Sequence, residues 1–307
     1  MANLKQLKLK RQSIDKTRKV TRAMEAVSAV KMRKSQELAL SGRPFAQTAL
    51  KILKALLKDA DNFTHPLLKT KENGKHGLLL ITSDKGLAGA LNSSVIKKAE
   101  NFINTHGVEN VVAVAVGRRA NEFLKARSVE VLHFQENKKD DVSLSDSRQI
   151  VDSILSAHES ITKDWTVYYM NFVSTFEQKA IERQLLPLLA SELESLVNDI
   201  APQKGKYKSA ESNSAESESK LVYTIESAAE NILDEIIPEL VNVFVHHALL
   251  ESKASEHSAR MVAMKSATDK AGELSHSLKL AFNKARQAAI TREVSEITSG
   301  VEAMKDA

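Results

Sequence analysis

The sequence contains no cysteine, so it has no disulfide framework, no thiol nucleophile and no cysteine-based metal site. Aromatic residues make up only 5% and prolines number only 5, so the 42% hydrophobic content lies mainly in Ala, Leu, Val and Ile. This blend suits helices that pack closely side by side. No run approaches the roughly 20 apolar residues that span a bilayer, and the opening residues lack the apolar core of a secretory signal. We therefore expect a folded chain that is neither integral to a membrane nor exported.

Basic residues are concentrated near the N-terminus of a chain whose formal net charge is +5. Residues 1–43 hold twelve Lys or Arg against three acidic residues, and the remainder is net acidic. Such an excess fits a solvated helix face, an acidic protein partner or nucleic acid. Nucleic acid is disfavoured because residues 1–43 contain no aromatic side chain on which a base could stack.

Residues 1–75 are predicted to form an N-terminal coiled-coil segment. Between Met1 and Arg43 there is no proline, and the first glycine is Gly42. Apolar residues recur there at mostly three- and four-residue steps: Leu4, Leu7, Ile14, Val20, Met24, Val27 and Val30. That spacing is typical of one face of a long amphipathic helix.

Residues 76–201 are predicted to form an α/β domain. Apolar runs indicate strands at residues 77–83, 111–117, 129–134 and 165–174. Helical patterns lie between them at residues 92–104, 118–127 and 144–160. Strands that alternate with helices favour a Rossmann-like domain on a mostly parallel sheet with both faces covered.

Residues 202–220 are predicted to form a mobile polar loop, because the segment has hardly any apolar residue to offset the entropy of ordering it.

Residues 221–307 are predicted to form a C-terminal coiled-coil helix. Its seam alternates steps of three and four residues: Met261, Met264, Thr268, Ala271, Ser275, Leu278, Phe282, Ala285 and Ala289. Because many of these residues are small, we expect a thin antiparallel pair in which the two terminal helices form a rod, with the α/β domain inserted between them.

The chain offers no convincing catalytic, cofactor or metal site. The nearest approach to a phosphate-binding loop is the stretch 83–92, but with only Gly86 and Gly89 it fits a tight structural turn better than nucleotide binding. His246 and His247 are adjacent on a predicted helix, so they point about 100° apart and cannot face one metal ion. We expect them to be surface or interface histidines.

Several stretches resemble the gamma subunits of F-type ATP synthases. They are residues 22–36 with 43–45, residues 83–92, residues 258–269, and residues 283–293 with Glu296 and Gly300. They span nearly the whole chain in the order of that family. Two features depart from it: Val301 stands where the family usually has Ala, and the polar loop is longer than expected.

The resemblance implies a central-stalk rotor. In that family the terminal helices form an antiparallel coiled coil whose tip enters an alternating hexamer of alpha and beta subunits. The α/β base sits with subunit epsilon on the ring of membrane c subunits, so rotation couples proton flow to ATP synthesis or hydrolysis. The chain would then be non-catalytic by itself, would bind no nucleic acid, and would lie peripherally on the cytoplasmic face of a bacterial inner membrane.

The resemblance also assigns contacts by position. Arg286 and Gln287 would hydrogen-bond to beta-subunit loops, and Met24 with Arg22 would pass the acidic lever segment of beta. Tyr223 and Glu226 would meet the polar loops of the c ring.

Two other classes of protein stay open. One is a non-rotary coiled-coil adaptor with an α/β head, with or without nucleic-acid binding through its basic N-terminal helix. The other is an enzyme with an unrecognised site in the α/β domain.

Overall fold

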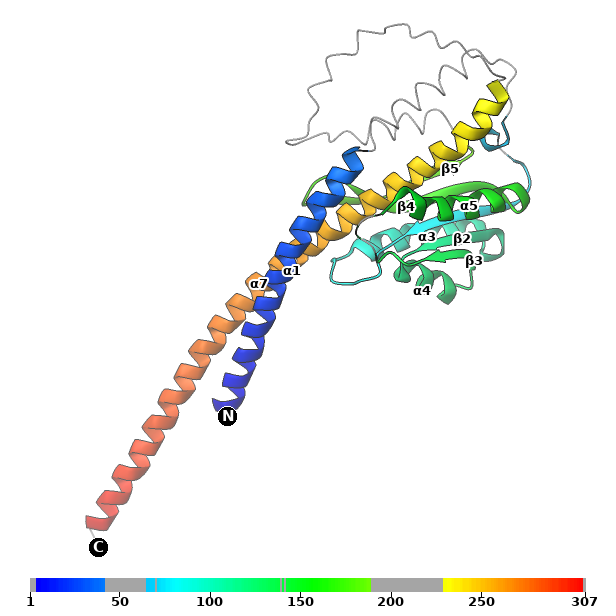
Figure 1. The fold of residues 1–307 in the computed structure, drawn as a ribbon. Coiled ribbons are helices and arrows are strands. Elements are labelled where there is room, and N and C mark those ends of the chain that lie inside the picture. The colour runs from blue at the N-terminus through cyan, green and yellow to red at the C-terminus, as the bar shows by residue number, and fades with distance from the viewer. Residues whose placement is uncertain are drawn as a thin grey trace. The chain divides into compact units, whose positions relative to one another are not determined.

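Figure 1 presents a computed structural model of the chain, which describes residues 4–41, 65–69, 71–138, 140, 142–188 and 229–305. The chain forms two compact units, one of Met1–Val27 with Met261–Ala307 and the other of Ser28–Arg260. Two long helices, α1 (Leu4–Ser41) and α7 (Ala229–Lys305), contribute residues to both units. The predicted terminal helices are therefore present, and α7 continues through Pro238 without ending there.

The larger unit contains one five-stranded sheet. Its strands are β1 (Lys75–Ile81), β2 (Val111–Val116), β3 (Glu130–Gln135), β4 (Thr162–Phe172) and β5 (Gln178–Leu186). The strand order is β3-β2-β1-β4-β5, in which the first four strands run parallel and β5 pairs antiparallel with β4. The predicted mostly parallel sheet is confirmed, and the predicted boundaries of its four parallel strands differ from the observed ones by at most three residues.

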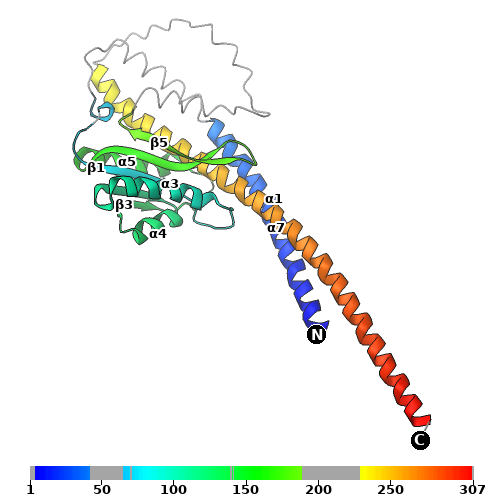
Figure 2. The ribbon, with the colours of Figure 1, turned by 180° about the vertical axis from the view of Figure 1, so that it is seen from behind.

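Helices cover both faces of this sheet (Figures 1 and 2). Helices α3 (Leu91–His106) and α4 (Arg118–Ala126) pack on one face, and α5 (Leu144–Ser160) packs on the other with the first third of α7. Short 3-10 helices span Pro66–Leu68 and Val108–Asn110. The interior strand β2 is apolar throughout and fully buried, as expected for a parallel strand between two helical layers.

The edge strand β5 was not predicted from the sequence. Its residues include Gln, Lys, Glu and Arg, which have little intrinsic preference for strands. Pairing with β4 along eight residue pairs decides its conformation. The connecting turn has no glycine, and Ser174 supplies the turn chemistry by accepting hydrogen bonds from the N–H groups of Phe176 and Glu177.

Two glycines are required by close approaches in this unit. A Cβ on Gly77 would lie 2.2 Å from the ring of Trp165, which is fully buried and donates its indole N–H to Thr162. Gly117 has a φ of +91°, and a Cβ there would lie 2.3 Å from the carbonyl oxygen of Thr82. These contacts hold the ends of β1, β2 and β4 closer together than any side chain on the glycines would allow.

Candidate functional site

The smaller unit is an antiparallel pair of helices. The hydroxyl of Thr268 on α7 lies 2.7 Å from that of Thr21 on α1, and Ser275 donates a hydrogen bond of 2.7 Å to Asp15. Pairing of a later α7 residue with an earlier α1 residue shows that the two helices run in opposite directions. The predicted antiparallel coiled coil is thus confirmed in this unit.

The predicted seam of α7 is nearly correct. Met264, Ala271 and Leu278 are buried. The half-buried seam residues are Met261, Thr268, Ser275, Phe282 and Ala285. Ala289 is exposed, which contradicts its predicted place in the seam. Extending the antiparallel register of the two hydrogen bonds places Ala289 beyond the level of Leu4, the first described residue of α1.

The predicted inner face of α1 is only partly correct. Leu4, Leu7, Ile14 and Met24 are half-buried as expected, but Val20, Val27 and Val30 are 53–69% exposed. Thr21 and Ser28 are buried instead. A pattern of three- and four-residue steps fits either of two adjacent helix faces, which lie about 100° apart, so the spacing alone does not decide which face meets α7. Small hydroxyl side chains fill the narrow seam, and the valines lie on the neighbouring face.

The last turns of α7 carry an exposed apolar stripe. Its members are 50–82% exposed and recur at steps of four and three residues: Ile290, Val294, Ile297, Val301 and Met304. In Figures 1 and 2 this end of α7 continues beyond the described start of α1. An apolar helix face of this length without a covering segment among the described residues marks a surface for another protein.

The predicted contact residues lie in different surroundings. Arg286 and Gln287 are both exposed just before the apolar stripe, and Arg22 is exposed on α1. Met24 is half-buried. Tyr223 and Glu226, and the predicted polar loop at 202–220, lie outside the described residues.

The carboxyl ends of the parallel strands form a second region of interest. In doubly wound sheets, ligands bind where the strand order reverses, which here lies between β1 and β4. One turn of α7 bonds to the loops that follow both strands. Ser258 donates to the carbonyl of Thr175 at 2.6 Å, and Arg260 lies 3.3 Å from the carbonyl of Gly86. The chain's own α7 therefore packs against the loops at this edge of the sheet.

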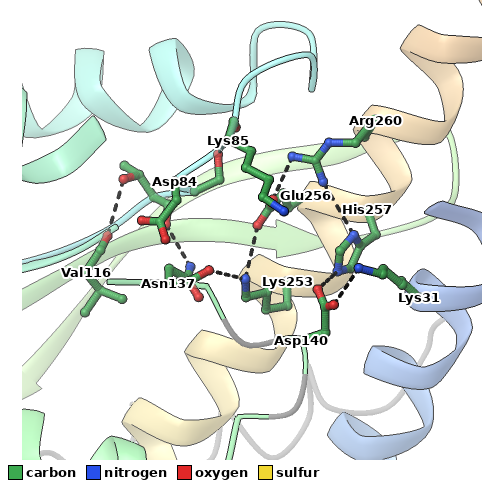
Figure 3. Close-up of polar contacts among 12 residues, drawn as sticks. Lys31, Asp84, Lys85, Val116, Asn137, Asp140, Lys253, Glu256, His257 and Arg260 are labelled. Carbon is green, nitrogen blue, oxygen red and sulfur yellow. Dashed lines mark hydrogen bonds and ion pairs between the residues drawn. The ribbon is translucent and has the colours of Figure 1, made fainter. Parts of the chain in front are cut away.

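Buried charges surround this turn of α7 (Figure 3). Lys253 is 2% exposed and donates a hydrogen bond of 2.5 Å to the backbone carbonyl of Asn137. The Asn137 amide in turn donates to the carbonyl of Thr82 at the end of β1. Glu256 accepts from Arg260 at 2.7 Å and lies 3.6 Å from Lys253. Each buried charge thus has an opposite charge or a carbonyl partner, as burial requires.

Asp140 lies at the edge of this cluster between two helices. Its carboxylate is 2.6 Å from Lys31 of α1 and 3.0 Å from His257 of α7. Burial alone would raise the pKa of Asp140, but the hydrogen bond from Lys31 and the nearby positive charges hold it below its usual value. Burial lowers the pKa of His257, and Glu256 and Asp140 oppose that shift.

The stretch 83–92 forms the tight turn that the sequence favoured. The hydroxyl of Ser83 accepts a hydrogen bond from the side-chain amide of Asn92, and the backbone N–H of Ser83 donates to the oxygen of the same side chain. Leu87 and Gly89 have positive φ angles of 63° and 59°. The turn closes on its own polar groups, while a Cβ on Gly86 or Gly89 would meet open space.

The histidine prediction is wrong for His247. This residue is buried in the larger unit, and burial lowers its pKa to about 3. His246 is half-buried, and its ring lies 3.0 Å from the carbonyl of Val142.

Within the part of the chain that the structure describes, no group of three or more His, Asp or Glu could hold a metal ion. No helix in that part is long and apolar enough to cross a membrane.

Comparisons with known proteins agree with this arrangement of helices and sheet. Two solved structures share the fold. One belongs to the central stalk and c ring of the Tetrahymena thermophila mitochondrial ATP synthase, with 22% identity, a TM-score of 0.57, and coverage of 81% of this chain and 99% of that one. The other belongs to the Euglena gracilis mitochondrial ATP synthase, with 18% identity, a TM-score of 0.62, and coverage of 98% and 94%.

Sequence relatives cover the whole chain. The ATP synthase gamma chain of Heliobacterium modesticaldum is 36% identical over 305 residues, which are 99% of this chain and 100% of that protein. The ATP synthase gamma chain of Legionella pneumophila strain Corby is 36% identical over 308 residues, with the same coverage. A family profile described as ATP synthase matches residues 3–304. The resemblance seen in the sequence is thereby confirmed: the chain belongs to the ATP synthase gamma chain family.

Proposed function

We propose that this chain is the central-stalk rotor of an F-type ATP synthase. It couples proton translocation through the c ring to ATP synthesis or hydrolysis at the alternating hexamer of alpha and beta subunits. One observation carries the proposal beyond family membership: α7 extends past the described part of α1 and presents an apolar stripe from Ile290 to Met304. A shaft that turns inside a ring of subunits needs such a helix.

The asymmetry of the shaft supplies the mechanism. Three chemically identical beta subunits around one helix pair meet different faces of it, so each is biased toward a different nucleotide state. Such a bias needs a difference in contact free energy between the states. The catalytic groups belong to the beta subunits. This chain rotates and presents a different surface to each of the three beta subunits.

Specific contacts complete the proposal. Arg286 and Gln287 bond to beta-subunit loops, for which their exposure is suited. Arg22 and Met24 lie along the acidic lever segment of beta. An acidic protein partner explains the basic excess of residues 1–43 better than nucleic acid does. Tyr223 and Glu226 meet the c ring, and subunit epsilon binds the α/β domain. The complex holds the chain peripherally at the cytoplasmic face of a bacterial membrane.

Reconstitution tests the proposal. Purified alpha and beta subunits from a related bacterial enzyme are mixed with this chain, and the complex is isolated by size exclusion. We expect a stable complex with one copy of the chain per hexamer, whereas the isolated chain hydrolyses no ATP. Recovery of hexamer and chain in separate fractions would contradict the proposal, as would ATP turnover by the chain alone.

A further inference from the structure

One carboxylate in the larger unit joins two helices. Asp140 follows β3, Lys31 belongs to α1, and His257 belongs to α7, and all three fall within Ser28–Arg260. Oδ2 of Asp140 lies 2.6 Å from Lys31 Nζ, and Oδ1 lies 3.0 Å from His257 Nε2. Figure 3 shows the carboxylate between the two side chains, with α1 on one side and α7 on the other.

We propose that these three residues, here named the Asp140 clasp, are positioning residues that make this part of α1 turn together with α7 and the α/β domain. This inference rests on the proposed function, because turning together matters only in a rotor. Torque applied to the α/β domain reaches α7 directly through the shared core. The part of α1 from Ser28 on lies in the larger unit, outside the seam of Thr21 with Thr268, and needs its own attachment there.

The attachment of α1 in this unit depends on few apolar contacts. Among residues 28–38 the buried side chains are Ser28, Met32 and Ser35. Val30 points to solvent with 69% of its surface exposed. One buried methionine and the half-buried Leu38 provide little hydrophobic attachment compared with the apolar core that holds α7 to the sheet. A polar tie is therefore a substantial part of what holds α1 here.

The clasp has one fixed side and one accessible side. His257 is 4% exposed, and its Nδ1 lies 3.5 Å from Arg260, which is itself paired with Glu256. Lys31 and Asp140 are 39% and 37% exposed. Asp140 thus meets a histidine whose position is set by buried neighbours, and it draws the lysine of α1 to that point.

The charges around the clasp favour an ionised Asp140. Lys31 faces it from α1, and His257, Lys253, Glu256 and Arg260 belong to α7. Three of these carry a permanent positive charge and one is acidic, so a carboxylate is the group that balances them. Replacement of Asp140 by Asn keeps its size, removes the ion pair with Lys31 and removes the negative charge beside His257.

Hydrogen exchange of the full chain tests the clasp itself. In Asp140→Asn, the amides of residues 28–35 should exchange faster than in the wild type by on the order of twofold to fivefold. The reason is that a partly exposed ion pair stabilises the folded segment against local opening by only about the thermal energy. Amides of β2 should be unchanged. The matched control is Glu136→Gln, which removes a carboxylate of the same loop that pairs with Arg118 and Lys138 instead. Equal exchange in the two variants would overturn the clasp.

A double-mutant cycle separates a clasp from a general loss of structure. Lys31→Met should raise the same exchange rates, and Lys31→Met with Asp140→Asn should be no faster than Asp140→Asn alone. Additive effects would overturn the pairing. If Asp140→Asn alone fails to fold, Lys31→Met still decides the question, because Lys31 is partly exposed and Met is a good helix former.

Rotor stiffness tests the role of the clasp in rotation. Lys97→Cys, on the exposed surface of α3 in a chain without cysteine, gives one attachment point for a bead. In the assembled complex, the angular variance of the stalled bead should rise on the order of twofold in Asp140→Asn and not in Glu136→Gln. Faster exchange with unchanged variance would overturn the mechanical role. A chain that forms no complex would refute the proposed function instead, while the exchange data would still decide the clasp.

Discussion

The hydroxyl groups of Thr21 and Thr268 lie 2.7 Å apart in the seam between α1 and α7, while Val20 is 58% exposed. The seam therefore uses a small polar pair where a valine was available one residue earlier. Two threonines whose hydroxyls bond each other let the helices approach closely without leaving a polar group unsatisfied. The valine remains on the outer surface, where the proposed function places other subunits.

Thr21→Val should destabilise the helix pair by about 1 kcal/mol, because it leaves the Thr268 hydroxyl with one partner fewer. The double change of both threonines to Val should cost no more than the single change. Thr17→Val is the matched control, since Thr17 is exposed and its hydroxyl donates to Ser13 of the same helix; it should stay within about 0.5 kcal/mol of the wild type. Thermal melting of the full chain, followed by helical circular dichroism, measures the differences. Equal losses for Thr17 and Thr21 would contradict the seam.

Gly77→Ala should destabilise the α/β domain by roughly 1–3 kcal/mol, because the new methyl would overlap the buried ring of Trp165. Gly86→Ala should be nearly neutral, because a Cβ at Gly86 meets open space. Trp165 is the only tryptophan, so its fluorescence reports unfolding of this domain directly. A Gly77→Ala variant as stable as Gly86→Ala would show that the ring does not lie across Gly77.

His158 should make the α/β domain sensitive to acid. Its ring nitrogens have no partner within the described residues, and burial with the nearby charge of Lys71 lowers its pKa to about 4. Below the unfolded pKa of about 6.5 the unfolded chain takes up a proton that the folded chain refuses, so stability falls as the pH drops from 6.5 toward 4.

His158→Leu should remove that loss. The substitution should reduce the difference in unfolding free energy between pH 7.5 and pH 5 by on the order of 1–2 kcal/mol, since one pKa unit corresponds to about 1.4 kcal/mol. Denaturant titrations followed by Trp165 fluorescence provide the measurement. His276→Leu, at an exposed site on α7, is the control and should leave the pH dependence unchanged. The same slope in His158→Leu and the wild type would contradict a neutral buried His158.

The sequence predicted the architecture well because its signals were local. Absence of breakers marked both long helices, and continuous apolar runs marked the four parallel strands. What failed depended on partners in space. Strand β5 has a polar composition and is fixed by pairing with β4, and the valines of α1 were assigned inward because spacing alone cannot distinguish two adjacent helix faces.

The charged cluster could not be predicted from the sequence for the same reason. Lys31, Asp140 and His257 are separated by more than a hundred residues at each step, and nothing in the local pattern of any one points to the others. Burial of Lys253 and Glu256 also contradicts what their residue types suggest. The contacts assigned to Arg286 and Gln287, in contrast, came from the resemblance and stay a prediction.

Changing Arg286 and Gln287 together to Ala should lower ATP synthesis and hydrolysis of the assembled complex on the order of tenfold, because hydrogen bonds to a charged group contribute roughly 1.5–3 kcal/mol each. Both residues are exposed, so the helix pair should survive the change. Lys284→Ala, also exposed, is the control. Rates are measured in reconstituted vesicles and normalised to intact complex. Wild-type rates in both directions would remove these residues from the contact with beta.

Rotation of the chain is the most direct test of the central claim. The alpha–beta hexamer is fixed to a surface, the chain carries a bead at Lys97→Cys, and ATP is added. We predict stepwise rotation of the bead in one direction, with three main stops per turn that match the three beta subunits. ATP hydrolysis by the complex while the bead stays fixed, or at an equal rate from a hexamer without the chain, would contradict the claim that this protein is the rotating shaft.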